Sequence, residues 1–160
     1  MIRKHLDFWE ILLNMIKKIN ILSLMIKDHC KIENLISELD EKNKVSFNEM
    51  KKAFTKFEWE LEKHIFTEEK AIFKDYNPDD FTLGYNMLPE LTKQHNYIIN
   101  TLNNWHEQIR KKNKLSDIYS FKEFIVKHKT FEEEKVYPKL EESLSNTDKK
   151  HIIAKIYEMV

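Results

Sequence analysis

Apolar residues recur at alternating steps of three and four along most of the chain, which places them on one face of an α-helix. The pattern runs from Phe47 to Ile72, from Leu88 to Ile109 and from Phe121 to Val136. An earlier stretch keeps the same steps from Phe8 to Leu39. Taken literally, that stretch predicts one helix of about 35 residues, or roughly 50 Å, with Asn20 and Ser23 as weak places for a kink.

Polar residues mark where these helices begin and end. The segment Ser46-Phe47-Asn48-Glu49 is a capping box that begins the second helix, and Asn77-Pro78-Asp79-Asp80 ends it. The basic stretch from Arg110 to Lys114 ends the third helix, and Ser116 or Asp117 begins the fourth. Pro138 is expected to kink or terminate the fourth helix, and Thr147 to cap a short last one.

Four long helices with short links predict an all-α fold, an antiparallel up-down four-helix bundle. We expect a single domain over residues 1–160, with a helical extension at 1–20, the bundle at 21–145 and a C-terminal helix at 146–160. Residues 8–26 are apolar on several faces, which a four-helix core does not cover. The extension is therefore expected to form a homodimer contact or to dock on the bundle as an extra helix.

Composition supports this fold and narrows the function. One Gly and three Pro among 160 residues disfavour a β-barrel and a Gly-rich phosphate loop. The 27 basic and 27 acidic residues cancel, which argues against nucleic acid or an anionic membrane as partner. The single Cys30 excludes a disulfide framework and fits a reducing compartment. With no apolar run long enough to span a membrane and no signal-peptide pattern, a cytoplasmic protein is expected.

Histidine interrupts the apolar face of each of the four helices. A buried imidazole without a partner costs about 1–3 kcal/mol, so four such positions call for a common explanation. The histidine positions are His29, His64, His95 and His128. His64 and His128 each have a glutamate four residues later on the same helix face, Glu68 and Glu132. Glu33 also stands four residues after His29, but Ile32 competes with it for the inward position.

The chemistry of these six residues indicates a metal centre. Imidazole and carboxylate without thiolate suit iron, manganese or zinc. Six ligands are too many for one tetrahedral zinc ion. Two metals, each held by two histidines and joined by bridging glutamates, use all six and leave positions for a bridging oxygen and an outside ligand.

The order His, HxxxE, His, HxxxE across four helices resembles the hemerythrin-like proteins, or HHE cation-binding domains, over roughly residues 20 to 145. The flanking Asp28, Glu69 and Glu133 are also similar to that family. The resemblance implies a four-helix bundle with a non-haem di-iron centre, oxo- or hydroxo-bridged when oxidised. It implies that His29 and His64 bind one iron, that His95 and His128 bind the other, and that Glu68 and Glu132 bridge them.

The sequence departs from the oxygen carriers of that family. Ile99 stands where they have a further histidine, and Glu133 where they have an aspartate ligand. The iron-centre repair members carry an N-terminal cysteine-bearing segment, which Cys30 alone does not supply. The chain therefore resembles the four-histidine branch of the family.

These features favour a di-iron protein that binds, senses or reacts with oxygen, nitric oxide or peroxide, or that handles iron. The alternative is a di-iron enzyme that reduces peroxide or oxygen or repairs iron centres. A third interpretation is an interaction module whose histidines only pack.

Other candidate residues have less support. His5, His106 and His151 are expected at the surface, and Cys30 is expected to be a structural thiol. Glu33 is a candidate acid behind the ligands, although Ile32 competes for the inward position. Three tyrosines are also candidates for hydrogen-bonding groups near the centre: Tyr97, Tyr119 and Tyr137.

Overall fold

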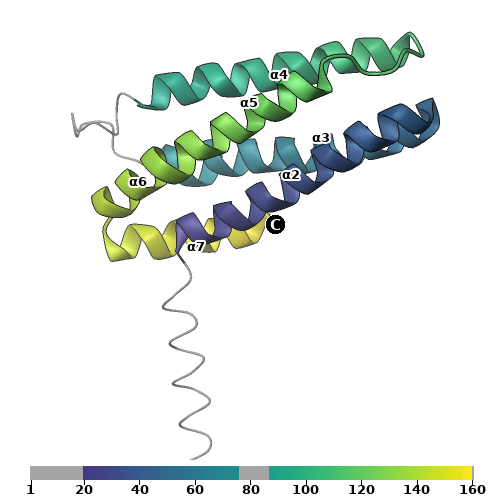
Figure 1. Ribbon diagram of the computed structural model, residues 1–160. Helices are drawn as coiled ribbons and strands as arrows, with labels where there is room; N and C mark the ends of the chain where they lie inside the picture. Colours follow the sequence, from purple (N-terminus) through teal and green to yellow (C-terminus); the bar gives the residue numbers. More distant parts are fainter. Residues whose placement is uncertain (1–19, 76–86, 160) are drawn as a thin grey trace, which may run out of the picture.

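A computed structural model describes residues 20–75 and 87–159, and within these ranges the regular secondary structure is all helix, with no strand. This confirms the all-α fold as a packed helical bundle (Figure 1). The elements are α2 (Ile21–Val45), α3 (Phe47–Thr67), η1 (Glu68–Ile72), η2 (Phe73–Asp75), α4 (Leu88–Arg110), α5 (Ile118–Phe131), η4 (Glu132–Val136), α6 (Tyr137–Ser143) and α7 (Asn146–Met159).

Helices α2 and α3 form a tight hairpin in which only Ser46 separates the two. Its backbone N–H donates to Lys42 O at the end of α2, and its side chain accepts from the Glu49 N–H at the start of α3. The predicted start of the second helix is confirmed. The predicted stop at Asn77-Pro78-Asp79-Asp80 lies outside the described residues.

The connection between α4 and α5 is held by side chains. Asn43 of α2 accepts from the Leu115 N–H and donates to Leu115 O. Trp105 donates its indole N–H to Ser116 O. Helix α4 ends at Arg110, and Asp117, with a left-handed φ of 60°, precedes α5. Both boundaries lie where the sequence predicted them.

The predicted single helix from Phe8 to Leu39 is wrong at Asn20. The backbone of Asn20 is extended, and its side chain accepts from the Ser23 N–H while the Ser23 side chain bonds back to the Asn20 backbone. This reciprocal capping box begins α2 at Ile21. Residues 1–19, and with them His5 and the predicted extension, lie outside the described part of the chain.

The predicted N-cap at Thr147 is also wrong. Helix α7 begins at Asn146, where the Ser145 side chain accepts from the Asp148 N–H, and the Asp148 carboxylate accepts from the Ser145 N–H. Ser145 and Thr147 are both good capping types, but only Ser145 has its capping partner three residues ahead. Pro138 does not terminate the fourth helix, because it occupies the first turn of α6, where its missing N–H costs no helical bond.

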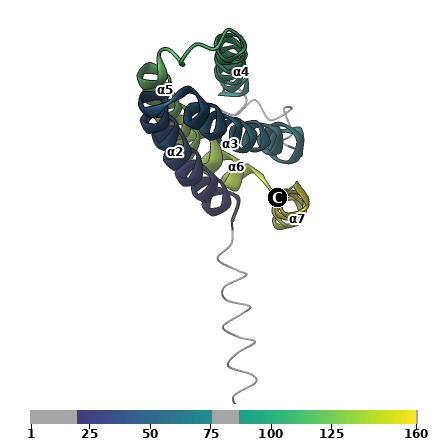
Figure 2. The same ribbon diagram turned by 90° about the vertical axis from the view of Figure 1, so that its right-hand side faces the viewer.

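Helix α7 lies beside the bundle (Figure 2), where it contacts η1, α2 and α3. It buries Ile152 and Ile156 against them. None of the helices described in the structure is long and apolar enough to cross a membrane.

The apolar core is divided into two clusters. One gathers residues such as Leu39, Phe57 and Trp105, and the other residues such as Met25, Ile72 and Leu140. Along each of the four long helices, the candidate metal ligands fall between members of the two clusters. In α2, for example, His29 lies between Met25 and Ile32. The bundle therefore carries one polar layer enclosed by apolar packing on both sides.

Candidate metal centre

The polar layer contains all six residues that the sequence singled out. Each is almost completely buried, with an exposed fraction between 0% and 3%: His29, His64, Glu68, His95, His128 and Glu132. They come from α2, α3, η1, α4, α5 and η4. Helical periodicity places each of them inward, because each takes a position on the helix face that is otherwise apolar.

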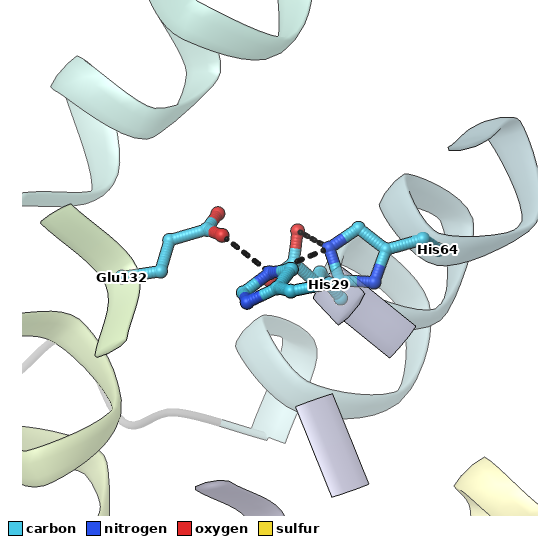
Figure 3. Close-up of side chains that lie close together, drawn as sticks. His29, His64 and Glu132 are labelled. Carbon is cyan, nitrogen blue, oxygen red and sulfur yellow. Dashed lines mark hydrogen bonds and ion pairs between the residues drawn. The ribbon is translucent and has the colours of Figure 1, made fainter. Parts of the chain in front are cut away.

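On one side of the layer, His29 and His64 face each other with their Nε2 atoms 3.1 Å apart. Glu132 Oε2 lies 3.1 Å from His29 Nε2, and Glu68 Oε2 lies 3.6 Å from His64 Nε2. Figure 3 shows Glu132 and His64 approaching His29 from different helices. His29, His64, Glu68 and Glu132 offer ligand atoms that all lie within 4.8 Å of one another.

The other side of the layer repeats this arrangement. His95 Nε2 lies 3.2 Å from Glu68 Oε2, and His128 Nε2 lies 3.1 Å from Glu132 Oε1. These four residues form a second group whose ligand atoms lie within 4.8 Å of one another. Both carboxylates thus belong to both groups, while each histidine pair belongs to one. Two metal positions that share two carboxylates fit this pattern.

A π-helical turn begins at each glutamate. Helix α3 changes to the π-helix η1 at Glu68, and α5 changes to the π-helix η4 at Glu132. Such turns occur frequently at functional sites. The sequence predicted regular helix through both positions, because apolar spacing cannot distinguish one wide turn from continuing α-helix.

The outer ring nitrogens of three of the four histidines also have hydrogen-bond partners. His29 Nδ1 lies 2.7 Å from Glu133 Oε1, His95 Nδ1 lies 3.2 Å from Glu69 Oε1 and His128 Nδ1 lies 2.9 Å from Gln94 Oε1. For His64 the neighbour is Asp28, at 3.8 Å. An Nδ1–H that donates to these oxygens leaves the inward Nε2 with its lone pair free, the form that ligates metals.

The layer carries a field that attracts positive charge. Burial lowers the pKa of His95, but hydrogen bonds and charges from Glu132 and Glu68 outweigh it and raise that pKa to about 10. Burial likewise opposes the interactions with Glu132 and Glu133 that raise the pKa of His29. For Glu132, burial is outweighed by the interactions with His128, His29 and His95, which hold its pKa below the usual range. An ionised carboxylate at the centre of the layer favours a cation there.

Two further pKa shifts follow from burial. His128 has its pKa lowered, mainly by burial and with a contribution from His95, although Glu132 opposes this. Tyr137 is fully buried and donates a short hydrogen bond to Glu68 Oε1. Burial, together with the nearby Glu132 and Glu68, raises its pKa well above the ordinary value. Its hydroxyl therefore stays protonated and holds one oxygen of Glu68.

The residues of the layer fit a metal ion. Several of their buried polar atoms have no hydrogen-bond partner among the described residues, although oppositely charged atoms lie nearby. They are His64 Nδ1, Glu68 Oε2, His95 Nε2, His128 Nε2 and both Glu132 oxygens. Leaving such atoms unpaired is costly. A cation between them would satisfy every one of these except His64 Nδ1, which points toward Asp28.

The sequence anticipated the six inward residues but not all of their supports. Asp28, Glu69 and Glu133 each adjoin a candidate ligand. The structure places Glu69 and Glu133 within hydrogen-bond distance of a ring nitrogen, and Asp28 3.8 Å from His64 Nδ1. Gln94 was missed: it precedes His95 but contacts His128 on another helix. This role depends on a contact between α4 and α5, and spacing along the sequence does not predict contacts between two helices.

The remaining candidates fall outside the layer. Cys30, His106 and His151 are exposed, as predicted for the two histidines. The Glu33 carboxylate does not reach the layer but lies 2.6 Å from Lys129 Nζ. Of the three tyrosines, Tyr137 reaches the layer, whereas Tyr97 and Tyr119 are exposed.

Fold and site together define an all-helical protein with a buried His/Glu metal-binding cluster. Residues 20–140 match the family described as Hemerythrin HHE cation binding domain, and the chain belongs to that family. Comparisons with curated proteins and with solved structures gave no significant match.

Proposed function

We propose that this HHE cation-binding domain holds two iron ions and uses them to bind or react with oxygen, nitric oxide or peroxide. One ion would be held by His29 and His64, the other by His95 and His128, and both would share Glu68 and Glu132. The observation that carries the proposal is the sharing of both carboxylates by two groups of buried ligand atoms.

The donor set supports iron as the metal. Four imidazoles and two carboxylates without thiolate suit iron, manganese and zinc, and open positions beside such ligands are typical of iron that reacts with oxygen. Membership of the hemerythrin family favours iron among the three. Bound iron would supply one- or two-electron chemistry toward a small ligand.

The chain's own residues would position the ligands and keep out bulk water. Glu133, Glu69 and Gln94 orient three imidazoles through Nδ1, and Tyr137 holds Glu68. A small cavity of about 10 Å³ lies beside His29, His64 and His128. That volume is about one water, so the cavity suits a ligand of two or three atoms.

Metal analysis of the purified protein tests the proposal. We expect about two irons per chain after anaerobic loading with ferrous iron and desalting, at the separation of roughly 3.5–4 Å typical of two-metal sites. An absorption spectrum of the oxidised protein should show bands that change on adding azide. Retention of one metal ion or none, with the helical content intact, would contradict the proposal.

A further inference from the structure

The cavity beside the histidines has one partly exposed wall. Among the described residues that line it, His29, Ile32, Leu61, His64, Ile125 and His128 are all buried. Lys129 is the exception, since its side chain is 22% exposed. The boundary between the cavity and solvent is therefore formed at Lys129.

An ion pair holds this boundary residue across two helices. Lys129 Nζ, on α5, lies 2.6 Å from Glu33 Oε2, on α2, and Glu33 is 29% exposed. Glu33 is one helical turn after His29, and Lys129 directly follows His128. The pair thus joins two of the three helices that carry cavity-lining histidines, α2 and α5, at the level of the cavity.

We propose that the Glu33–Lys129 ion pair, defined here as the gate, controls the admission of small uncharged ligands to the histidine side of the centre. The inference rests on the proposed function in that the ligand binds the metal pair. With the pair closed, the lysine side chain covers a cavity that otherwise holds about one water. A ligand enters when Lys129 leaves Glu33 and swings into solvent.

The charges of the gate also set which ligands it favours. Lys129 and Glu33 cancel when paired, so the mouth of the cavity offers no net attraction to an anion. Removing the carboxylate would leave an ammonium group at the mouth, which attracts anions. Removing the ammonium group would leave a carboxylate, which repels them. The entry rate of a neutral ligand depends on neither charge, and it changes only with how often the gate opens.

This difference allows a two-ligand test on iron-loaded protein. Glu33→Gln and Lys129→Met both break the pair, and Met keeps an unbranched side chain on the cavity wall. Partly exposed pairs contribute up to about 1 kcal/mol, so we expect nitric oxide to associate about fivefold faster with both variants. Azide should accelerate more in Glu33→Gln than in Lys129→Met. Stopped-flow absorbance measures both rates.

Lys149→Met is the matched control. Lys149 pairs with Glu141 at 3.2 Å, with exposed fractions of 25% and 22%, but it does not line the cavity. Its rates should equal those of the parent protein. Nitric oxide rates that stay unchanged in both gate variants would overturn the proposal, whatever azide does.

Histidine C2 hydrogen–deuterium exchange, followed by mass spectrometry on protein dialysed against a chelator, needs no metal. In the gate variants it should accelerate at His29, His64 and His128, whereas His95, which does not line this cavity, should be unchanged. A parent protein that takes up no iron contradicts the proposed function alone. Unchanged exchange at all four histidines in both gate variants contradicts the gate.

Discussion

At the scale of single residues, the four histidines use their two ring nitrogens for different tasks. Each turns Nε2 toward the shared carboxylates and Nδ1 toward an oxygen outside the layer. The outward partners fix the ring orientation, and burial excludes competing water. Affinity for a cation should therefore depend on both sets of residues.

The first prediction concerns the inward residues. His64→Ala and His128→Ala each remove one imidazole from a different group of four. Removing a ligand should lower the metal affinity of that position by at least 10–100-fold, the loss typical for residues that only hydrogen-bond a ligand. Iron per chain after loading and desalting measures the loss. His106→Ala, an exposed control residue paired with Glu58, should retain the parent iron content, and equal iron in all three variants would rule out the assignment.

The second prediction separates the outward partners from their neighbours. Glu133→Ala removes the acceptor 2.7 Å from His29 Nδ1, and we expect metal affinity at that position to fall by about 10–100-fold. Glu134→Ala, one residue later and exposed, should leave affinity unchanged. Competition with a chelator of known affinity measures both. Equal affinities would show that Glu133 does not support the site.

At the scale of helices, the sequence predicted which segments are helical better than it predicted where a helix breaks or changes its pitch. The apolar patterns that start at Phe47, Leu88 and Phe121 each correspond to a helical segment. The histidines and glutamates predicted on the apolar faces are all buried. The sequence marked Asn20 only as a weak place for a kink, because apolar steps continue across it, whereas the extended backbone there depends on a local side-chain bond with Ser23. The π turns at Glu68 and Glu132 were missed because the predicted apolar patterns end at Ile72 and Val136, one turn later, too soon to show the changed pitch.

The third prediction tests the start of α7. Ser145→Ala removes the side chain that accepts from the Asp148 N–H, and it should lower the free energy of unfolding by about 1 kcal/mol. Thr147→Ala, the position that sequence alone favoured, lies inside the helix and should change it by less than about half of that. Urea denaturation gives both values. A larger loss for Thr147→Ala would mean that Thr147, two residues later, caps the helix instead.

At the scale of the whole molecule, the polar layer divides the core. Apolar clusters lie on both sides of it, so the bundle is stabilised at its two ends and carries unpaired polar atoms between them. Ligands from six elements meet there, which links α2 through η4 at one level. A bound cation would therefore stabilise the native state of the entire bundle rather than that of one helix.

The last prediction follows from this linkage. Binding only to the folded state raises the free energy of unfolding by about 2.7 kcal/mol when free metal is 100 times its dissociation constant. For a domain of this length, that corresponds to a melting temperature roughly 5–10 °C higher than that of protein treated with chelator. Differential scanning calorimetry with and without ferrous iron measures the difference. In His64→Ala/His128→Ala, both metal positions are damaged, so its two melting curves should nearly coincide. If the parent protein also melted at one temperature in both conditions, the buried layer would not bind metal in the folded state.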